Sequence, residues 1–207
     1  EEVFLSDDGI FANVKPGTYV VDMTTSSPSL AVRLYELGKE KGLHVMDAPV
    51  SGGDSGAKAG TLSIMVGGDE ADFEAIVPMF QAFGKSINYM GPAGCGQHTK
   101  AANQICVAGA TAAYTEAIIY AQKVGLDPEK MLQAISGGAA GSWQINNMAP
   151  RALHGDHAPG FFIKHFVKDM RIVKSEAAAK GVDLEMLDSV LGLYEKMMER
   201  GYENDGT

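Results

Sequence analysis

The sequence has little cysteine, no concentration of basic charge and no long apolar run. Its two cysteines, Cys95 and Cys106, form no CxxC or Cys/His spacing, which argues against a disulfide framework or a structural zinc site. Lys and Arg total 17 against 26 Asp and Glu, and the net charge of −9 argues against nucleic acid or a membrane as a partner. No apolar run approaches the roughly 18 residues of a membrane span. We therefore expect a cytoplasmic protein that binds small molecules.

The residues before Gly96 alternate between short apolar runs and amphipathic segments. The apolar runs are bounded by Gly, Pro and Asp, which predicts strands over 18–23, 43–50, 62–68 and 86–90. Leucines at helical spacing and Pro28 near a first turn predict a helix between the first two strands. Another helix is predicted from about Asp69, between the third and fourth strands. Strand, helix and strand in this order predict an α/β layer.

After Gly96 the sequence changes character. Residues 97–125 contain no proline, are rich in alanine and end at Gly125, which predicts one helix roughly 40 Å long. The later segments also read as helices, and no strand is needed among them. The predicted fold class is therefore α/β followed by all-α, with domains at 1–96 and 97–207. Small residues along the long helix would let other helices approach closely, so we expect a homo-oligomer, a dimer or a tetramer.

The run "DAPVSGGDSGAKAGTL" at 47–62 is the first candidate site. It follows an apolar strand, and ligands of open α/β sheets bind in loops outside the carboxyl ends of strands. Ser51, Gly52 and Gly53 offer a hydroxyl and backbone N–H groups without covering side chains, which suits a carboxylate or a phosphate. The alternative is a flexible hairpin tip without function.

The run "GPAGCGQHTKAANQ" at 91–104 is the second candidate. Lys100 falls in the first turns of the long helix, with Asn103 and Gln104 on the same side at i+3 and i+4. An ammonium can hydrogen-bond a carbonyl oxygen and donate a proton to it, while an amide orients the substrate. Burial or a nearby cation would have to lower the lysine pKa for this role. The alternative is a solvated helix lysine. The five histidines form no HxxH or HExxH pattern, so no metal site is predicted.

Both runs resemble, in order and spacing, the signature motifs of the β-hydroxyacid dehydrogenase family, which includes 3-hydroxyisobutyrate dehydrogenase and tartronate semialdehyde reductase. Two shorter matches are "KDM" at 168–170 and "DMTT" at 22–25. The resemblance covers essentially the whole chain. It implies that residues 1–96 are the C-terminal part of a Rossmann-like dinucleotide-binding domain, followed by the helical domain of the family.

The resemblance also implies roles for individual residues. Lys100 would be the catalytic lysine, a general acid on the carbonyl oxygen in reduction and a general base on the hydroxyl in oxidation. Thr25 would lie near the nicotinamide, and Lys168 would reach the cofactor from the helical domain. The residues implied for substrate binding are Ser51, Gly52, Gly53, Asn103 and Gln104.

The family's G-x-G-x-x-G turn, which receives the dinucleotide pyrophosphate, is absent from these 207 residues. We expect the chain to be a fragment that is inactive alone and binds dinucleotide poorly. For the full protein, the resemblance implies NAD- or NADP-dependent reversible oxidation of a small 3-hydroxy acid to its semialdehyde. Reduction of tartronate semialdehyde (2-hydroxy-3-oxopropionate) is the first choice. The alternatives are a 3-hydroxyisobutyrate dehydrogenase and a non-catalytic oligomerisation module.

Overall fold

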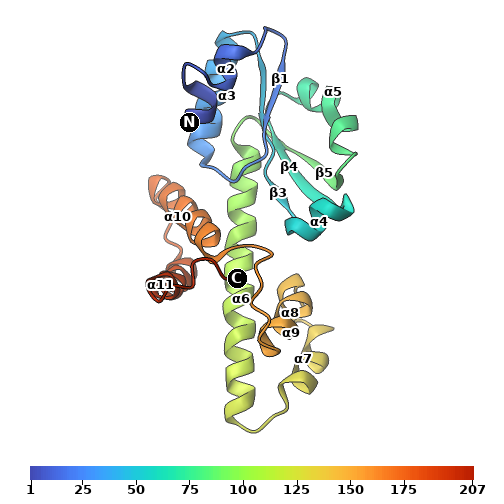
Figure 1. The fold of residues 1–207 in the computed structure, drawn as a ribbon, viewed down its shortest axis with the longest axis vertical. Coiled ribbons are helices and arrows are strands. Elements are labelled where there is room, and N and C mark those ends of the chain that lie inside the picture. Colours follow the sequence, from blue (N-terminus) through green and yellow to red (C-terminus); the bar gives the residue numbers. More distant parts are fainter. The chain divides into compact units, whose positions relative to one another are not determined.

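The structure is a computed structural model that describes residues 1–207, and it divides into two compact units, Glu1–Ala102 and Asn103–Thr207. The first is an α/β unit and the second is helical (Figure 1). Helix α6, Cys95–Lys123, begins in the first unit and continues into the second. The predicted fold class is therefore confirmed, and so is the long helix. The domain boundary at 96/97 stays a prediction.

A five-stranded mixed sheet organises the first unit. β1 pairs with β2 and β4 pairs with β5 in parallel, whereas β4 runs antiparallel to β2 and β3. The strand predicted over 43–50 is divided in two. The division follows from a change of partner: the Ala48 N–H still donates to Asp22, whereas the Pro49 carbonyl accepts from Met65 of β4. The strands are β1 Tyr19–Asp22, β2 His44–Asp47, β3 Val50–Ser51, β4 Leu62–Gly67 and β5 Gly84–Gly91.

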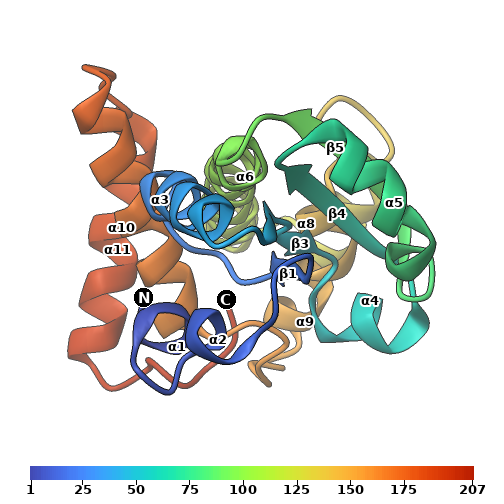
Figure 2. The same ribbon diagram turned by 90° about the horizontal axis from the view of Figure 1, so that it is seen from above.

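Helices cover both faces of this sheet, as Figures 1 and 2 show for α3 (Pro28–Glu40) and α5 (Glu70–Phe80). Consecutive side chains of a strand point to opposite faces. Val45 of β2 accordingly packs with α3 and the short helices α1 (Glu2–Leu5) and α2 (Ile10–Asn13). Met46 packs with the apolar side of α5. The strands are thus buried between two helical layers.

The glycine-rich run at 47–62 is not the loop that the sequence predicts. It contains β3 and a seven-residue helix, α4, Gly53–Ala59. Asp54 and Lys58 form an ion pair of 2.8 Å one turn apart on α4, and Gly60 ends the helix in the left-handed conformation. Leu62 packs over Gly52, where an added Cβ would lie 3.1 Å from the leucine Cδ2. The glycines give this run a low helix propensity. Its packing against β4 outweighs that propensity, and a helix forms.

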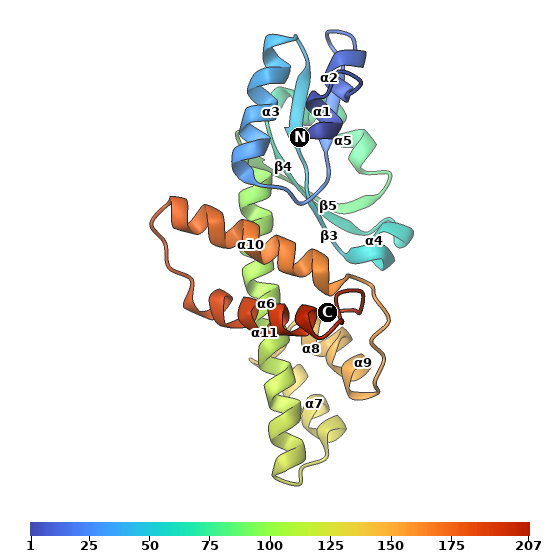
Figure 3. The same ribbon diagram turned by 60° about the vertical axis from the view of Figure 1, so that its left-hand side comes forward.

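The second unit consists of helices around the later part of α6. Three short helices pack on α6 through an apolar cluster that includes Tyr114 and Ile118. Two further helices, α10 and α11, lie side by side (Figure 3), with Phe166 and Tyr194 in edge-to-face contact. The helices are α7 Pro128–Ser136, α8 Trp143–Asn147, α9 Ala149–Leu153, α10 Ile163–Ala179 and α11 Glu185–Glu199. None of the helices has both the length and the apolar character needed to cross a membrane.

Candidate active site

Two aspartates stand side by side at the carboxyl ends of adjacent parallel strands. Asp22 of β1 and Asp47 of β2 are register partners, and both are buried. Burial raises the pKa of Asp47, the charge of Asp22 adds to this rise, and backbone N–H groups oppose it. Buried carboxylates are costly unless they are hydrogen-bonded. Each aspartate therefore needs partners at this edge of the sheet.

Asp47 finds its partners at the start of α6. Its Oδ1 accepts a hydrogen bond from the Gly94 N–H at 2.7 Å, and its Oδ2 accepts one from the Gln97 N–H at 2.8 Å. A carboxylate is favoured at a helix N-terminus because the first N–H groups have no partners within the helix. The start of α6 lies so close to the sheet that the chain needs glycine at the points of contact. A Cβ on Gly96 would lie 2.4 Å from the Met65 carbonyl oxygen, and a Cβ on Gly67 would lie 2.6 Å from Asp47.

Asp22 fixes the loop that follows β1. Its Oδ1 accepts from both the N–H and the hydroxyl of Thr24, at 3.0 and 2.7 Å. The side chain of Gln97 holds the same loop from α6: its Nε2 donates to the Thr24 carbonyl at 2.7 Å, and its Oε1 accepts from the Ser26 N–H at 3.1 Å. Thr25, predicted to lie near a nicotinamide, is in the middle of this loop and is half-buried.

Lys100 follows on the same helix, three residues after Gln97. It is 8% exposed, so the alternative of a solvated surface lysine is wrong. The carboxyl edge of β1 and β2 thus supports the first turns of α6, which carry the lysine. Ser51 is half-buried at the end of β3, and Gly52 and Gly53 are exposed with φ angles of +129° and +60°. Their role in substrate binding stays a prediction.

The second unit contains another series of connected polar contacts. Gln104 is 3% exposed, and its Nε2 donates to Asp169 Oδ2 at 2.6 Å. Its Oε1 accepts from Asn103 Nδ2 at 2.8 Å. Lys168 Nζ lies 2.8 Å from Asp169 Oδ1, which is an ion pair by distance without hydrogen-bond geometry. Asp169 therefore holds the Gln104 side chain, which in turn orients the Asn103 amide. The role of Lys168 at the cofactor stays a prediction.

Two residues of this arrangement were not singled out from the sequence. Asp47 opens the quoted "DAPVSGG" run and Gln97 stands beside the glycines of α6, yet neither was assigned a role. The available signal was a charged residue directly after the apolar "LHVM" strand, since a charge there needs a buried partner. Which residue supplies that partner depends on the tertiary fold.

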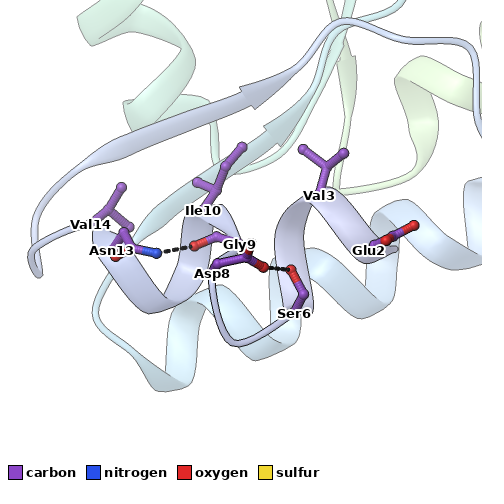
Figure 4. Close-up of a pocket in the computed structure, with 8 residues that line it drawn as sticks. All are labelled: Glu2, Val3, Ser6, Asp8, Gly9, Ile10, Asn13 and Val14. Carbon is purple, nitrogen blue, oxygen red and sulfur yellow. Dashed lines mark hydrogen bonds between the residues drawn. The ribbon is translucent and has the colours of Figure 1, made fainter.

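The first unit has a hollow in its surface (Figure 4). It is lined by residues between Glu2 and Val14. Its polar groups contact one another: Ser6 Oγ donates to Asp8 Oδ1 at 2.9 Å, and Asn13 Nδ2 donates to the Gly9 carbonyl at 2.9 Å. None of the predicted site residues lines it, so it is not part of the candidate active site.

Comparisons with known families match both parts of the chain. Residues 1–91 match the NAD binding domain of 6-phosphogluconate dehydrogenase. Residues 94–207 match the family described as NAD-binding of NADP-dependent 3-hydroxyisobutyrate dehydrogenase. The fold and these matches define a nicotinamide-dinucleotide-binding class of protein. The chain belongs to the β-hydroxyacid dehydrogenase family.

Individual relatives agree with this assignment. The chain is 52% identical over its whole length to an uncharacterized oxidoreductase of Bacillus subtilis, YkwC, and covers 72% of it. It is 44% identical to a probable mitochondrial 3-hydroxyisobutyrate dehydrogenase-like protein of Arabidopsis thaliana, with 96% of this chain and 59% of that one aligned. It is 41% identical to 2-hydroxy-3-oxopropionate reductase of Escherichia coli, with 89% and 63% aligned.

A solved structure gives the same answer for the fold. The crystal structure of 3-hydroxyisobutyrate dehydrogenase from Salmonella typhimurium superposes with a TM-score of 0.88 at 27% identity. The superposition covers 98% of this chain and 71% of that one. The family matches identify the cofactor as NAD or NADP.

The described residues fit one end of such a dinucleotide. The loop 23–27 lies outside the carboxyl end of β1, where α/β sheets receive ligands, and it is held by Asp22 and Gln97. The contact of Thr25, in this loop, with the nicotinamide end stays a prediction. The glycine-rich turn for the pyrophosphate does not occur in the 207 residues, so no pyrophosphate contact is assigned.

Proposed function

We propose that the full natural protein catalyses the reversible, NAD(P)-dependent oxidation of a small 3-hydroxy acid to its semialdehyde. The observation that carries the proposal is the buried Lys100 on the helix that Asp47 anchors to the carboxyl edge of the sheet. A buried lysine needs a reason, because desolvation disfavours its charged form. Acid–base chemistry at a carbonyl is such a reason.

In the proposed mechanism, Lys100 holds and moves one proton. Its ammonium donates a hydrogen bond to the carbonyl oxygen of the semialdehyde and transfers the proton as negative charge develops there. In the oxidation direction, the neutral amine takes the proton from the substrate hydroxyl. The bound cofactor supplies or accepts the hydride. Excluding water from Lys100 strengthens its interaction with the developing charge.

The proposed substrate site combines a hydroxyl, backbone N–H groups and an amide. Ser51 Oγ and the N–H groups of Gly52 and Gly53 would hold the substrate carboxylate, since both glycines are exposed and carry no side chain of their own. Asn103 would orient the substrate, with Gln104 holding its amide in place. Thr25 and Lys168 are proposed as cofactor contacts.

We propose 2-hydroxy-3-oxopropionate as the first substrate, supported by the 41% identity to the Escherichia coli reductase of that name. The Arabidopsis relative supports the 3-hydroxyisobutyrate couple as the alternative. Both substrates carry one carboxylate and a carbonyl carbon two bonds away from it. The proposed residues would therefore serve either one, and only the group at the intervening carbon distinguishes them. The homo-oligomer also remains a prediction, to be tested by light scattering.

The test uses the full natural protein and follows NADH and NADPH oxidation with 2-hydroxy-3-oxopropionate and with methylmalonate semialdehyde. Wild type is compared with Lys100→Met and with Lys123→Met, a control at the other end of α6. We expect kcat to fall about 10²-fold or more for Lys100→Met, the scale of losing a general acid, and to stay unchanged for Lys123→Met. Absence of turnover in wild type with every 3-hydroxy acid tested would favour the non-catalytic module.

A further inference from the structure

Gln97 uses every polar group that its side chain has. It is 1% exposed, and its amide donates to the Thr24 carbonyl and accepts from the Ser26 N–H. Its own backbone N–H donates to Asp47. One residue thus connects the end of β2, the loop after β1 and the first turn of α6. All of these contacts lie within the first unit.

The position of Gln97 on α6 relates this connection to Lys100. Residues three apart in a helix are neighbours on one face, and both Gln97 and Lys100 are buried. The loop that Gln97 holds contains Thr25 between its two contacts. A displacement of the loop relative to α6 would therefore change the position of Thr25 relative to Lys100.

The two contacts also account for glutamine at this place. The Thr24 carbonyl needs a donor and the Ser26 N–H needs an acceptor, and a primary amide provides both on one planar group. Glutamate keeps the acceptor and, when ionised, loses the donor. Methionine keeps the length and approximate volume of the side chain and loses both.

We propose that Gln97 is a positioning residue that holds the cofactor-side loop at 24–26 and the lysine-bearing turn of α6 as one rigid element. The inference rests on the proposed function for the identity of the two groups it aligns. Both polar atoms of the Gln97 side chain contact the loop, so the role proposed for it is positioning. Its effect is on geometry, because a misplacement of about 1 Å in an active site can cost about 10²-fold in rate.

The experiment compares Gln97→Met and Gln97→Glu with His98→Met in the full natural protein. His98 is the exposed neighbour of Gln97 on the same helical turn and receives the same replacement. Amide hydrogen exchange of the 24–27 segment is measured without cofactor, so that the loop is observed independently of activity. The kcat and the KM values for cofactor and for substrate are then measured separately.

We expect the Ser26 amide to exchange at least about tenfold faster in Gln97→Met, because its acceptor is removed. We expect kcat to fall about tenfold or more, while the KM for the hydroxy acid changes less than about twofold. Gln97→Glu keeps the acceptor, so Ser26 should stay protected and the loss of kcat should be smaller. His98→Met should match wild type in every measurement.

Wild-type exchange at Ser26 in Gln97→Met would overturn the inference, as would a kcat equal to that of His98→Met. A loss of activity that only follows global unfolding would overturn it too, and the exchange of core amides in β4 reports that case. Absence of turnover in the wild-type protein would contradict the proposed function and not the inference on Gln97. The exchange measurement then still decides whether Gln97 fixes the loop.

Discussion

Asp47 Oδ2 accepts a hydrogen bond of 2.8 Å from the backbone N–H of Gln97, although the two residues are 50 positions apart. This contact, together with the one from Gly94, makes the end of β2 the N-terminal cap of α6. A helix that is capped by a strand end cannot shift without breaking buried hydrogen bonds. The position of Lys100 is thereby set by the sheet.

Replacing Asp47 by Asn tests this cap. Asparagine has the same shape, but its amide would place an N–H group against the N–H of either Gly94 or Gln97. We expect the free energy of unfolding to fall by about 1–3 kcal/mol, the cost of a buried donor left without an acceptor. Denaturant unfolding of both proteins measures the change. A variant as stable as wild type would show that the cap contributes nothing.

The difference in stability between wild type and Asp47→Asn should depend on pH. Burial raises the pKa of Asp47, so the folded state binds its proton more tightly than the unfolded state does. The contribution of such a carboxyl to stability is complete below its unfolded pKa and is lost as pH rises through the folded pKa. The stability of wild type minus that of Asp47→Asn should therefore be larger at about pH 4 than at about pH 7. A constant difference would contradict the raised pKa.

Gly96→Ala should be strongly destabilising. Its Cβ would lie 2.4 Å from the Met65 carbonyl and 2.8 Å from Asp47, and these backbone groups belong to the sheet. We expect a loss of about 3 kcal/mol or more from overpacking. Gly192→Ala is the matched control: nothing lies within 4 Å of its added Cβ in α11, so it should gain about 0.5–1 kcal/mol. Equal effects of the two substitutions in thermal unfolding would refute the close approach.

Ser51→Ala should weaken substrate binding. Losing one hydrogen bond to a carboxylate costs about 1.5–3 kcal/mol, which corresponds to a KM at least about tenfold higher. Ser189→Ala is the control, because the Ser189 hydroxyl is exposed on α11 and donates to the Glu185 carbonyl at 3.0 Å, away from the proposed site residues. Steady-state kinetics with each semialdehyde measures both. An unchanged KM for Ser51→Ala would remove Ser51 from the proposed carboxylate site.

Gln104→Met separates a supporting role from a direct substrate contact. The substitution breaks the contacts with Asp169 and Asn103, so we expect a stability loss of about 1–3 kcal/mol together with a raised KM. Gln122→Met, an exposed position on the same helix, should change stability by less than about 0.5 kcal/mol. A raised KM at wild-type stability would mean that Gln104 touches the substrate itself.

The elements that were predicted are those with strong local signals. Apolar runs bounded by Gly, Pro and Asp predicted the strands, and the proline-free, alanine-rich segment predicted α6. The helix at Gly53–Ala59 was missed because its glycines predict a loop. It forms because β3 and β4 hold its ends and Leu62 packs against Gly52.

The residues of the candidate site also fall into those that the sequence could predict and those that it could not. Lys100, Ser51 and Asn103 could be singled out from the sequence because their motifs are contiguous and resemble a known family. Asp47 and Gln97 could not be assigned roles, because the function of a buried polar residue depends on partners far along the chain.

The sequence by itself determined the α/β and all-α order of the chain, the long helix and the motifs of the family, because periodicity and spacing are local properties. Only the tertiary structure decided that Asp47 caps α6, that Gly67 and Gly96 make room for it, and that Gln97 joins this cap to the Thr24–Ser26 loop. The physical reason is that a buried carboxylate or amide must be satisfied by whatever donors and acceptors the fold brings within hydrogen-bond distance. Folding brings those partners together from positions that sequence spacing does not relate.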